Sequence, residues 1–101
     1  MTSDASAILE HHLIGSDAVR RRRLEDAFVD ALIGQVIHAA RVEAGLTQQQ
    51  LAKLVDTTQS VISRLEDADY HGHSVAMLRR IAEALGKRLE IRFVPAKPRA
   101  A

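Results

Sequence analysis

The chain has 101 residues, which is enough for one domain with an additional arm or tail. Apolar residues make up 47% of the sequence and aromatic residues only 3%, so any core must be built from Leu, Ile, Val and Ala between closely packed helices. The absence of cysteine excludes a disulfide framework and thiolate metal sites, and a net charge of +1 neither requires nor forbids a nucleic-acid partner.

The first 45 residues are predicted to be helical. Residues 1–16 fit a short helix that ends at Gly15, and residues 16–45 fit a long helix. Gly34 is a weak point in the longer run, so two helices that meet near this residue are an alternative to one.

An apolar stripe runs along this region, because Leu24, Phe28 and Leu32 recur at steps of four. Two interpretations are open: the stripe packs on the protein's own core, or it lies, with the acidic side chains beside it, in a groove on a basic partner protein. The run Arg20–Arg23 similarly fits either a phosphate clamp on DNA or a solvated helix face that nearby acids partly neutralise, and we favour the solvated face.

Three short helices are predicted to follow. Thr47 opens the first with a capping box, since a glutamine stands three positions later. The run Asp56–Thr58 interrupts this helix and caps the next one, and Ser74 caps the last helix, which Gly86 closes. The residues expected to face inward have helical spacing: Ile33, Val36, Ile37, Ala40, Leu51, Leu54, Val55, Ile62, Leu65, Val75, Leu78, Ile81, Ala82 and Leu85.

Two short helices joined by a tight turn, within Gly45–Asp67, suggest a helix-turn-helix, whose second helix projects side chains into the major groove of DNA. Small Ala52 lies where the two helices would approach each other. The outward residues of the second helix are of types that read base edges: Gln59, Ser60, Ser63 and Arg64. Gln48 begins the first helix, where an amide and free backbone N–H groups suit a phosphate.

The stretch "GLTQQQLAKLVDTTQSVISRLE" resembles the Cro/C1-type helix-turn-helix of lambdoid phage repressors, and the resemblance covers residues 35–86. It includes the Leu-Thr-Gln start, the Leu-Ala pair, the Thr-Gln-Ser opening of the second helix and its Leu-Glu end. The chain departs from the family at Asp56, where a glycine is usual in the turn. Aspartate adopts the left-handed conformation at a modest energetic cost.

The resemblance also implies roles for individual residues. Gln48 would contact a phosphate and brace Gln59. The residues implied to face bases are Gln59, Ser60 and Arg64. The residues implied to touch the DNA backbone are Thr58 and Ser63.

The periodicity changes near the C-terminus, where "KRLEIRFV" alternates and predicts a strand. No other segment offers a partner strand, so pairing with a second copy across a two-fold axis is expected. An antiparallel pair centred on Ile91 places Glu90 opposite Arg92 and Leu89 opposite Phe93, and both pairings are favourable across strands.

A small chain with one helix-turn-helix and a terminal strand resembles the HigA-type and HipB-type antitoxins of bacterial toxin–antitoxin modules. The resemblance implies an autorepressor that binds its own palindromic operator and neutralises a cognate toxin. That toxin would be a RelE/HigB-like messenger-RNA nuclease for the HigA type, which the N-terminal helix favours, or a kinase for the HipB type. A plain phage-type or metabolic repressor without a toxin partner is the rival interpretation.

The sequence thus predicts an all-α, lambda-repressor-like domain of four to five helices with a C-terminal strand that pairs across a dimer. The expected layout is an N-terminal helical segment at 1–30 that contacts the toxin, a DNA-binding domain at 31–86, and a dimerisation strand and tail at 87–101. Catalytic motifs, metal-ligand spacing, a signal peptide and a membrane-length apolar run are not found, so we expect a cytoplasmic non-enzyme without cofactor or metal.

Overall fold

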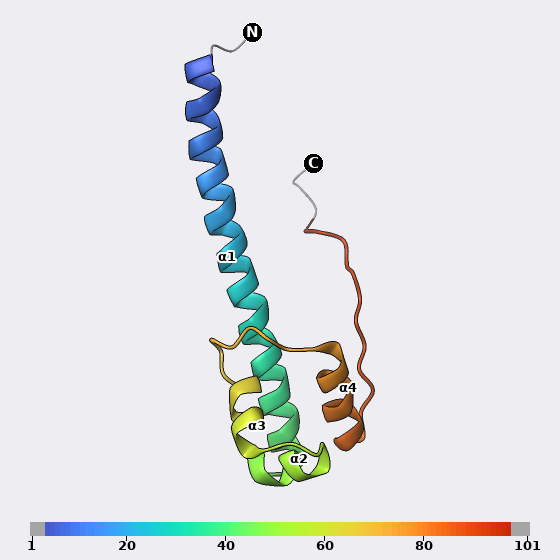
Figure 1. Ribbon diagram of the computed structural model, residues 1–101. Helices are drawn as coiled ribbons and strands as arrows, with labels where there is room; N and C mark the ends of the chain where they lie inside the picture. The colour runs from blue at the N-terminus through green and yellow to red at the C-terminus, as the bar shows by residue number, and fades with distance from the viewer. Residues whose placement is uncertain (1–3, 98–101) are drawn as a thin grey trace.

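The computed structural model describes residues 4–97, with side chains from residue 17 onward (Figure 1). It is all-α within these residues, and its four helices are α1 (Asp4–Glu43), α2 (Gln48–Leu54), α3 (Gln59–Leu65) and α4 (Val75–Ala84). The three short helices gather around the C-terminal part of α1, while the N-terminal part of α1 projects away from them, as Figure 1 shows. No helix within residues 4–97 combines the length and the apolar character that crossing a membrane requires.

Helix α1 is continuous, so the predicted helix end at Gly15 and the predicted alternative of a break at Gly34 are both wrong. A glycine inside a helix costs only about 1 kcal/mol relative to alanine, which is too little to end a long helix. At Gly34 the missing side chain has a packing function. A Cβ atom there would lie 3.0 Å from the carbonyl oxygen of Glu66, so glycine lets the end of α3 approach α1 closely.

The predicted caps of the three short helices are confirmed. The Thr47 hydroxyl accepts the Gln50 N–H at 3.1 Å, and the Gln50 side chain accepts the Thr47 N–H at 2.8 Å, which completes the capping box. Thr58 and Ser74 cap α3 and α4 in the same way through their hydroxyl groups. These bonds satisfy N–H groups that a helix leaves free at its start, and they fix where each helix begins.

The turn between α2 and α3 contains Asp56, whose φ of 58° is left-handed. Glycine adopts this conformation without strain, which is why it is usual at this position in the Cro/C1-type family. Here aspartate adopts it. The Thr57 N–H donates to the Ala52 carbonyl at 2.8 Å across the turn. The turn therefore keeps the helix-turn-helix geometry despite the substitution.

The core lies between α2, α3, α4 and the C-terminal part of α1. Its buried residues are Ile37, Leu51, Ala52, Val55, Ile62, Leu65 and Ile81. Each fully buried aliphatic side chain contributes about 1.5–3 kcal/mol to folding. Three predicted core residues are instead exposed, namely Val36, Leu54 and Val75. The two-turn α2 buries only one narrow stripe, which leaves out Leu54, and Val75 is the first residue of α4, ahead of the turns that reach the core.

The apolar stripe of α1 does not pack on the protein's own core, so that interpretation is wrong. Leu24 is 66% exposed and Phe28 is 64% exposed, because the short helices gather around the C-terminal part of α1 and leave every residue from 17 to 29 exposed. The stripe remains available to another protein.

Residues 87–97 extend away from α4 without regular structure, and the structure has no strand within residues 4–97. The predicted strand is therefore not found in the single chain. A strand is defined by hydrogen bonds to a second strand, and residues 4–97 contain no other segment that could supply them. Pairing between two copies remains a prediction.

Candidate nucleic-acid interface

The helix-turn-helix presents one face of α3 to solvent and anchors the opposite face. Ile62 and Leu65 are buried in the core, and buried Ala52 allows α2 and α3 to pack together, as expected. The four outward residues predicted from the sequence are all exposed on α3: Gln59, Ser60, Ser63 and Arg64. Thr58 is also exposed and caps the same helix. The structure therefore gathers these five residues on one rigid, accessible surface.

A hydrogen bond joins the two helices at this surface. The Gln59 amide donates to the Gln48 side-chain oxygen at 3.5 Å, which is the bracing contact expected from the sequence. The Gln48 amide in turn donates to Glu66 at 3.4 Å. Gln48 thus lies between Gln59, the first residue of α3, and the Glu66 carboxylate, whose side chain is only 5% exposed.

Arg41 and Glu66 form an ion pair beneath this surface, which the sequence analysis missed. Arg41 donates from Nε to one carboxylate oxygen at 2.6 Å and from Nη2 to the other at 2.9 Å. Its Nη1 donates to the Leu46 carbonyl at 2.8 Å. The side chains are only 11% and 5% exposed, so this bidentate pair fixes the end of α3 to α1 and to the loop that precedes α2.

The sequence contained a signal for this pair. Arg41 lies four residues after Ile37, on the side of α1 that faces the core, and a charged residue at such a position requires a buried partner. The partner, Glu66, is 25 residues away in the sequence, so no local sequence pattern identifies it. His38 also donates to Glu66 from Nδ1 at 2.8 Å.

The pKa of each group follows from these contacts. Burial alone raises the pKa of Glu66, but hydrogen bonds from Arg41, His38 and Gln48 together outweigh this effect and hold the pKa below its ordinary value. The hydrogen bond to Glu66 raises the pKa of Arg41, against the opposing effect of burial. Both groups therefore remain charged at neutral pH.

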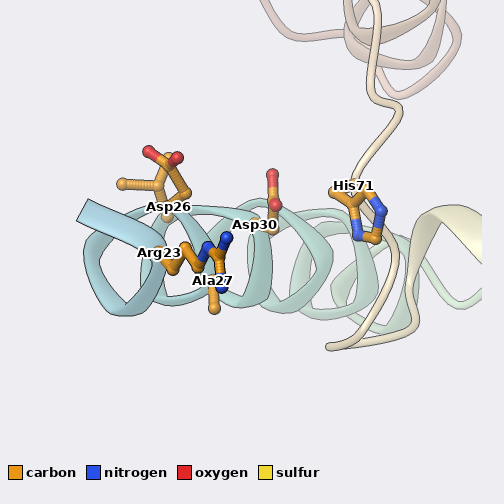
Figure 2. A pocket seen from close by; sticks show the side chains of 6 residues that line it. Arg23, Asp26, Ala27, Asp30 and His71 are labelled. Atoms are coloured by element: carbon orange, nitrogen blue, oxygen red, sulfur yellow. The ribbon is translucent and has the colours of Figure 1, made fainter. Parts of the chain in front are cut away.

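Figure 2 shows a second surface feature, an open hollow of about 450 Å³ between α1 and the loop that carries His71. Arg23, Asp26 and Asp30 of α1 are among the residues that line it, and Figure 2 labels them beside His71. Within the described part of the chain, no group of three or more His, Asp or Glu side chains is arranged to hold a metal ion. Arg20–Arg23 are all exposed on α1, so the solvated face and the phosphate clamp both remain predictions.

A braced two-helix unit with an exposed polar second helix defines a helix-turn-helix protein. Residues 37–91 match the family model described as "Helix-turn-helix", and the chain belongs to this family, which is of the Cro/C1 type and is not enzymatic. The sequence also matches an uncharacterized HTH-type transcriptional regulator of Rickettsia prowazekii (strain Madrid E), with 38% identity over 65 residues. A protein of the same description from Rickettsia conorii (strain ATCC VR-613 / Malish 7) is 37% identical over 65 residues.

Both matches cover 64% of this chain, but only 49% and 51% of the two relatives. The chain therefore spans about half the length of the curated relatives that it matches. The similarity applies to 65 residues of each protein and leaves about half of each Rickettsia relative unmatched.

Proposed function

We propose that this chain is a transcriptional repressor that binds a palindromic operator as a homodimer, with α3 in the major groove of each half-site. The observation that carries the proposal is the exposed row of Gln59, Ser60, Ser63 and Arg64 on a helix whose other side is buried. The relatives described as transcriptional regulators support the same role. Half-sites one helical turn apart, about 34 Å, would match the two-fold symmetry of a dimer.

Each residue has a role in this proposal. Gln59 has the amide geometry for a bidentate contact with adenine, Arg64 the guanidinium geometry for guanine, and Ser60 can bond to either. Gln48, Thr58 and Ser63 contact the DNA backbone and set the register of the helix. The Gln48 contact holds the Gln59 amide in place before DNA binds, which reduces the ordering cost of recognition.

Gel-shift titration with DNA from the protein's own promoter tests the proposal. Gln59→Ala and Arg64→Ala are each expected to weaken binding by about 1–3 kcal/mol, or about fivefold to 150-fold. Arg79→Ala is the matched control, since it removes an exposed arginine on α4 that pairs with Glu83. Unchanged operator affinity in the combined Gln59→Ala, Arg64→Ala variant would reject the assignment of these residues.

A second role is proposed on the exposed stripe of α1, namely that of an antitoxin. Leu24 and Phe28 form an uncovered apolar face, and Glu25, Asp26 and Asp30 give the same region acidic side chains. The stretch 24–32 carries these three acids and no cation, so it is complementary to a basic RNA-cleaving enzyme, which supports a RelE/HigB-like nuclease toxin over a HipB-type kinase partner. The toxin contact would occupy residues 1–30, the DNA-binding domain 31–86 and the dimer contact 87–101; the boundary at residue 30 falls inside the continuous α1.

Co-expression of this chain with the product of its neighbouring gene tests the antitoxin role. We expect the two proteins to purify together, and the Leu24→Asp, Phe28→Asp variant to lose the partner. The same variant should bind operator DNA normally, because both residues lie outside the core and outside α3. A neighbour that encodes no toxin-like protein, or a complex that survives both substitutions, would leave the plain repressor as the better interpretation.

A further inference from the structure

An apolar groove lies between α1, α4 and the C-terminal segment. Buried Ile37 and Ile81 form its floor, and Val36, Leu85 and Leu89 line its sides, with a volume of about 300 Å³. Val36 is 65% exposed on the wall of this groove. Figure 1 shows the C-terminal segment leaving the end of α4 and running in the same direction as the projecting part of α1.

Phe93, four residues after the groove-lining Leu89, is the most exposed of the large apolar side chains in the described residues. It is fully exposed in the single chain, although an aromatic ring gains more than most side chains from burial. Its own groove is out of reach, because four residues of extended chain place Phe93 about 13 Å beyond Leu89. The ring is therefore free to contact a surface outside its own chain.

We infer that the groove receives Phe93 of a second copy of this chain, an inference that rests on the proposed homodimer. In an antiparallel pair centred on Ile91, Phe93 of each copy lies opposite Leu89 of the other, at a Cβ separation of about 5 Å. Opposed residues of such a pair project from the same face. Since Leu89 lines the groove, its opposite residue is delivered to the groove as well.

The size of the groove and the charges of the segment agree with this occupant. An apolar cavity of about 150 Å³ admits a benzene molecule, so a groove of about 300 Å³ accommodates a phenyl ring. On the other face of the pair, Glu90 of each copy lies opposite Arg92 of the other. Within one chain these two side chains are 4.0 Å apart and largely exposed, so they can turn toward the second copy at little cost.

Sedimentation equilibrium of the full chain across the micromolar range tests the inference. Phe93→Ala is expected to raise the dimer dissociation constant about a thousandfold, since each of the two symmetric rings contributes about thirtyfold. Val36→Asp, which places a charge on the groove wall, should weaken the dimer similarly. Val94→Ala is the matched control, because Val94 is exposed and projects from the other face of the extended segment.

A fluorescence measurement checks where the ring goes. The chain contains no tryptophan, so Phe93→Trp introduces a single reporter. Its emission should shift to shorter wavelength as the concentration rises and the dimer forms, and Val36→Asp should abolish this shift. A shift that survives Val36→Asp would mean that the ring is buried elsewhere, and would overturn the inference.

The remaining outcomes separate this inference from the proposed function. A wild-type chain that stays monomeric would overturn both the dimer and the groove contact. A dimer that Phe93→Ala leaves intact would keep the dimer but reject Phe93 as the occupant of the groove. A Phe93-dependent dimer that binds no operator would reject the repressor role and support the groove contact.

Discussion

Glu66→Ala is expected to lower the free energy of unfolding by about 3–5 kcal/mol, because it leaves the buried Arg41 guanidinium without its partner. The loss includes the cost of leaving a buried guanidinium charge without a carboxylate to accept its hydrogen bonds, and not only the lost hydrogen bonds. Urea denaturation followed by circular dichroism measures it. For a small domain this is a large part of the total stability.

Three comparisons isolate the cause. Glu83→Ala removes an exposed i,i+4 partner of Arg79 and should cost only about 0.3–0.5 kcal/mol. Arg41→Met combined with Glu66→Leu removes both charges and should recover most of the stability, since apolar pairs of similar volume replace buried ion pairs well. If Glu66→Ala costs no more than Glu83→Ala, the buried pair does not stabilise the fold.

The stabilisation by Glu66 also has a defined pH range. Its pKa is lower in the folded chain than in the unfolded chain, so its contribution is fully present above the unfolded value and is lost as the pH falls through the folded value. The difference in stability between the wild type and Glu66→Gln should therefore shrink in acid below about pH 4. A difference that is constant across this range would contradict the pKa shift.

Gly34→Leu is expected to destabilise the fold by about 3 kcal/mol through overpacking. The new side chain meets backbone atoms of Glu66 and Asp67 at 3.0–3.3 Å from its Cβ alone, and backbone cannot turn aside as a flexible side chain can. The end of α3 must move, and Glu66 must move with it. Urea denaturation measures the loss, and the amide resonances of Gln59 and Arg64 report the displacement of α3.

Gln35→Leu is the matched control for this substitution. It adds the same leucine one position along α1, at an exposed site, and should change the stability by less than about 0.5 kcal/mol. If both leucines have equal effects, the close approach at Gly34 does not determine the packing of α3 on α1.

The helix boundaries and most of the core could be predicted because local chemistry determines them. Thr47, Thr58 and Ser74 bond to N–H groups three residues ahead, and this information lies within one turn of sequence. The periodic placement of Leu51, Ile62 and other buried residues is similarly local. The exposed residues of α3 then follow from the buried ones, since the two sets occupy opposite sides of one short helix.

The contacts between distant segments could not be predicted in this way. Gly34 has the sequence character of a helix breaker, and only the approach of α3 reveals its packing role. Arg41 and Glu66 are 25 positions apart, so no window of sequence contains both. The alternation at 88–94 predicts a strand, but a strand needs hydrogen bonds from a second strand, and residues 4–97 contain no strand to supply them.

The continuity of α1 has a mechanical consequence. A 40-residue helix is about 60 Å long at 1.5 Å per residue. No break interrupts α1 between its N-terminal turns and Gly34, where the end of α3 packs against it. The helix acts as a lever arm. If its N-terminal turns, some 40 Å from Gly34, are displaced by about 7 Å, α1 rotates by about 10° at its contact with α3. A force on the distal turns of α1 is therefore transmitted directly to the contact between α1 and the end of α3.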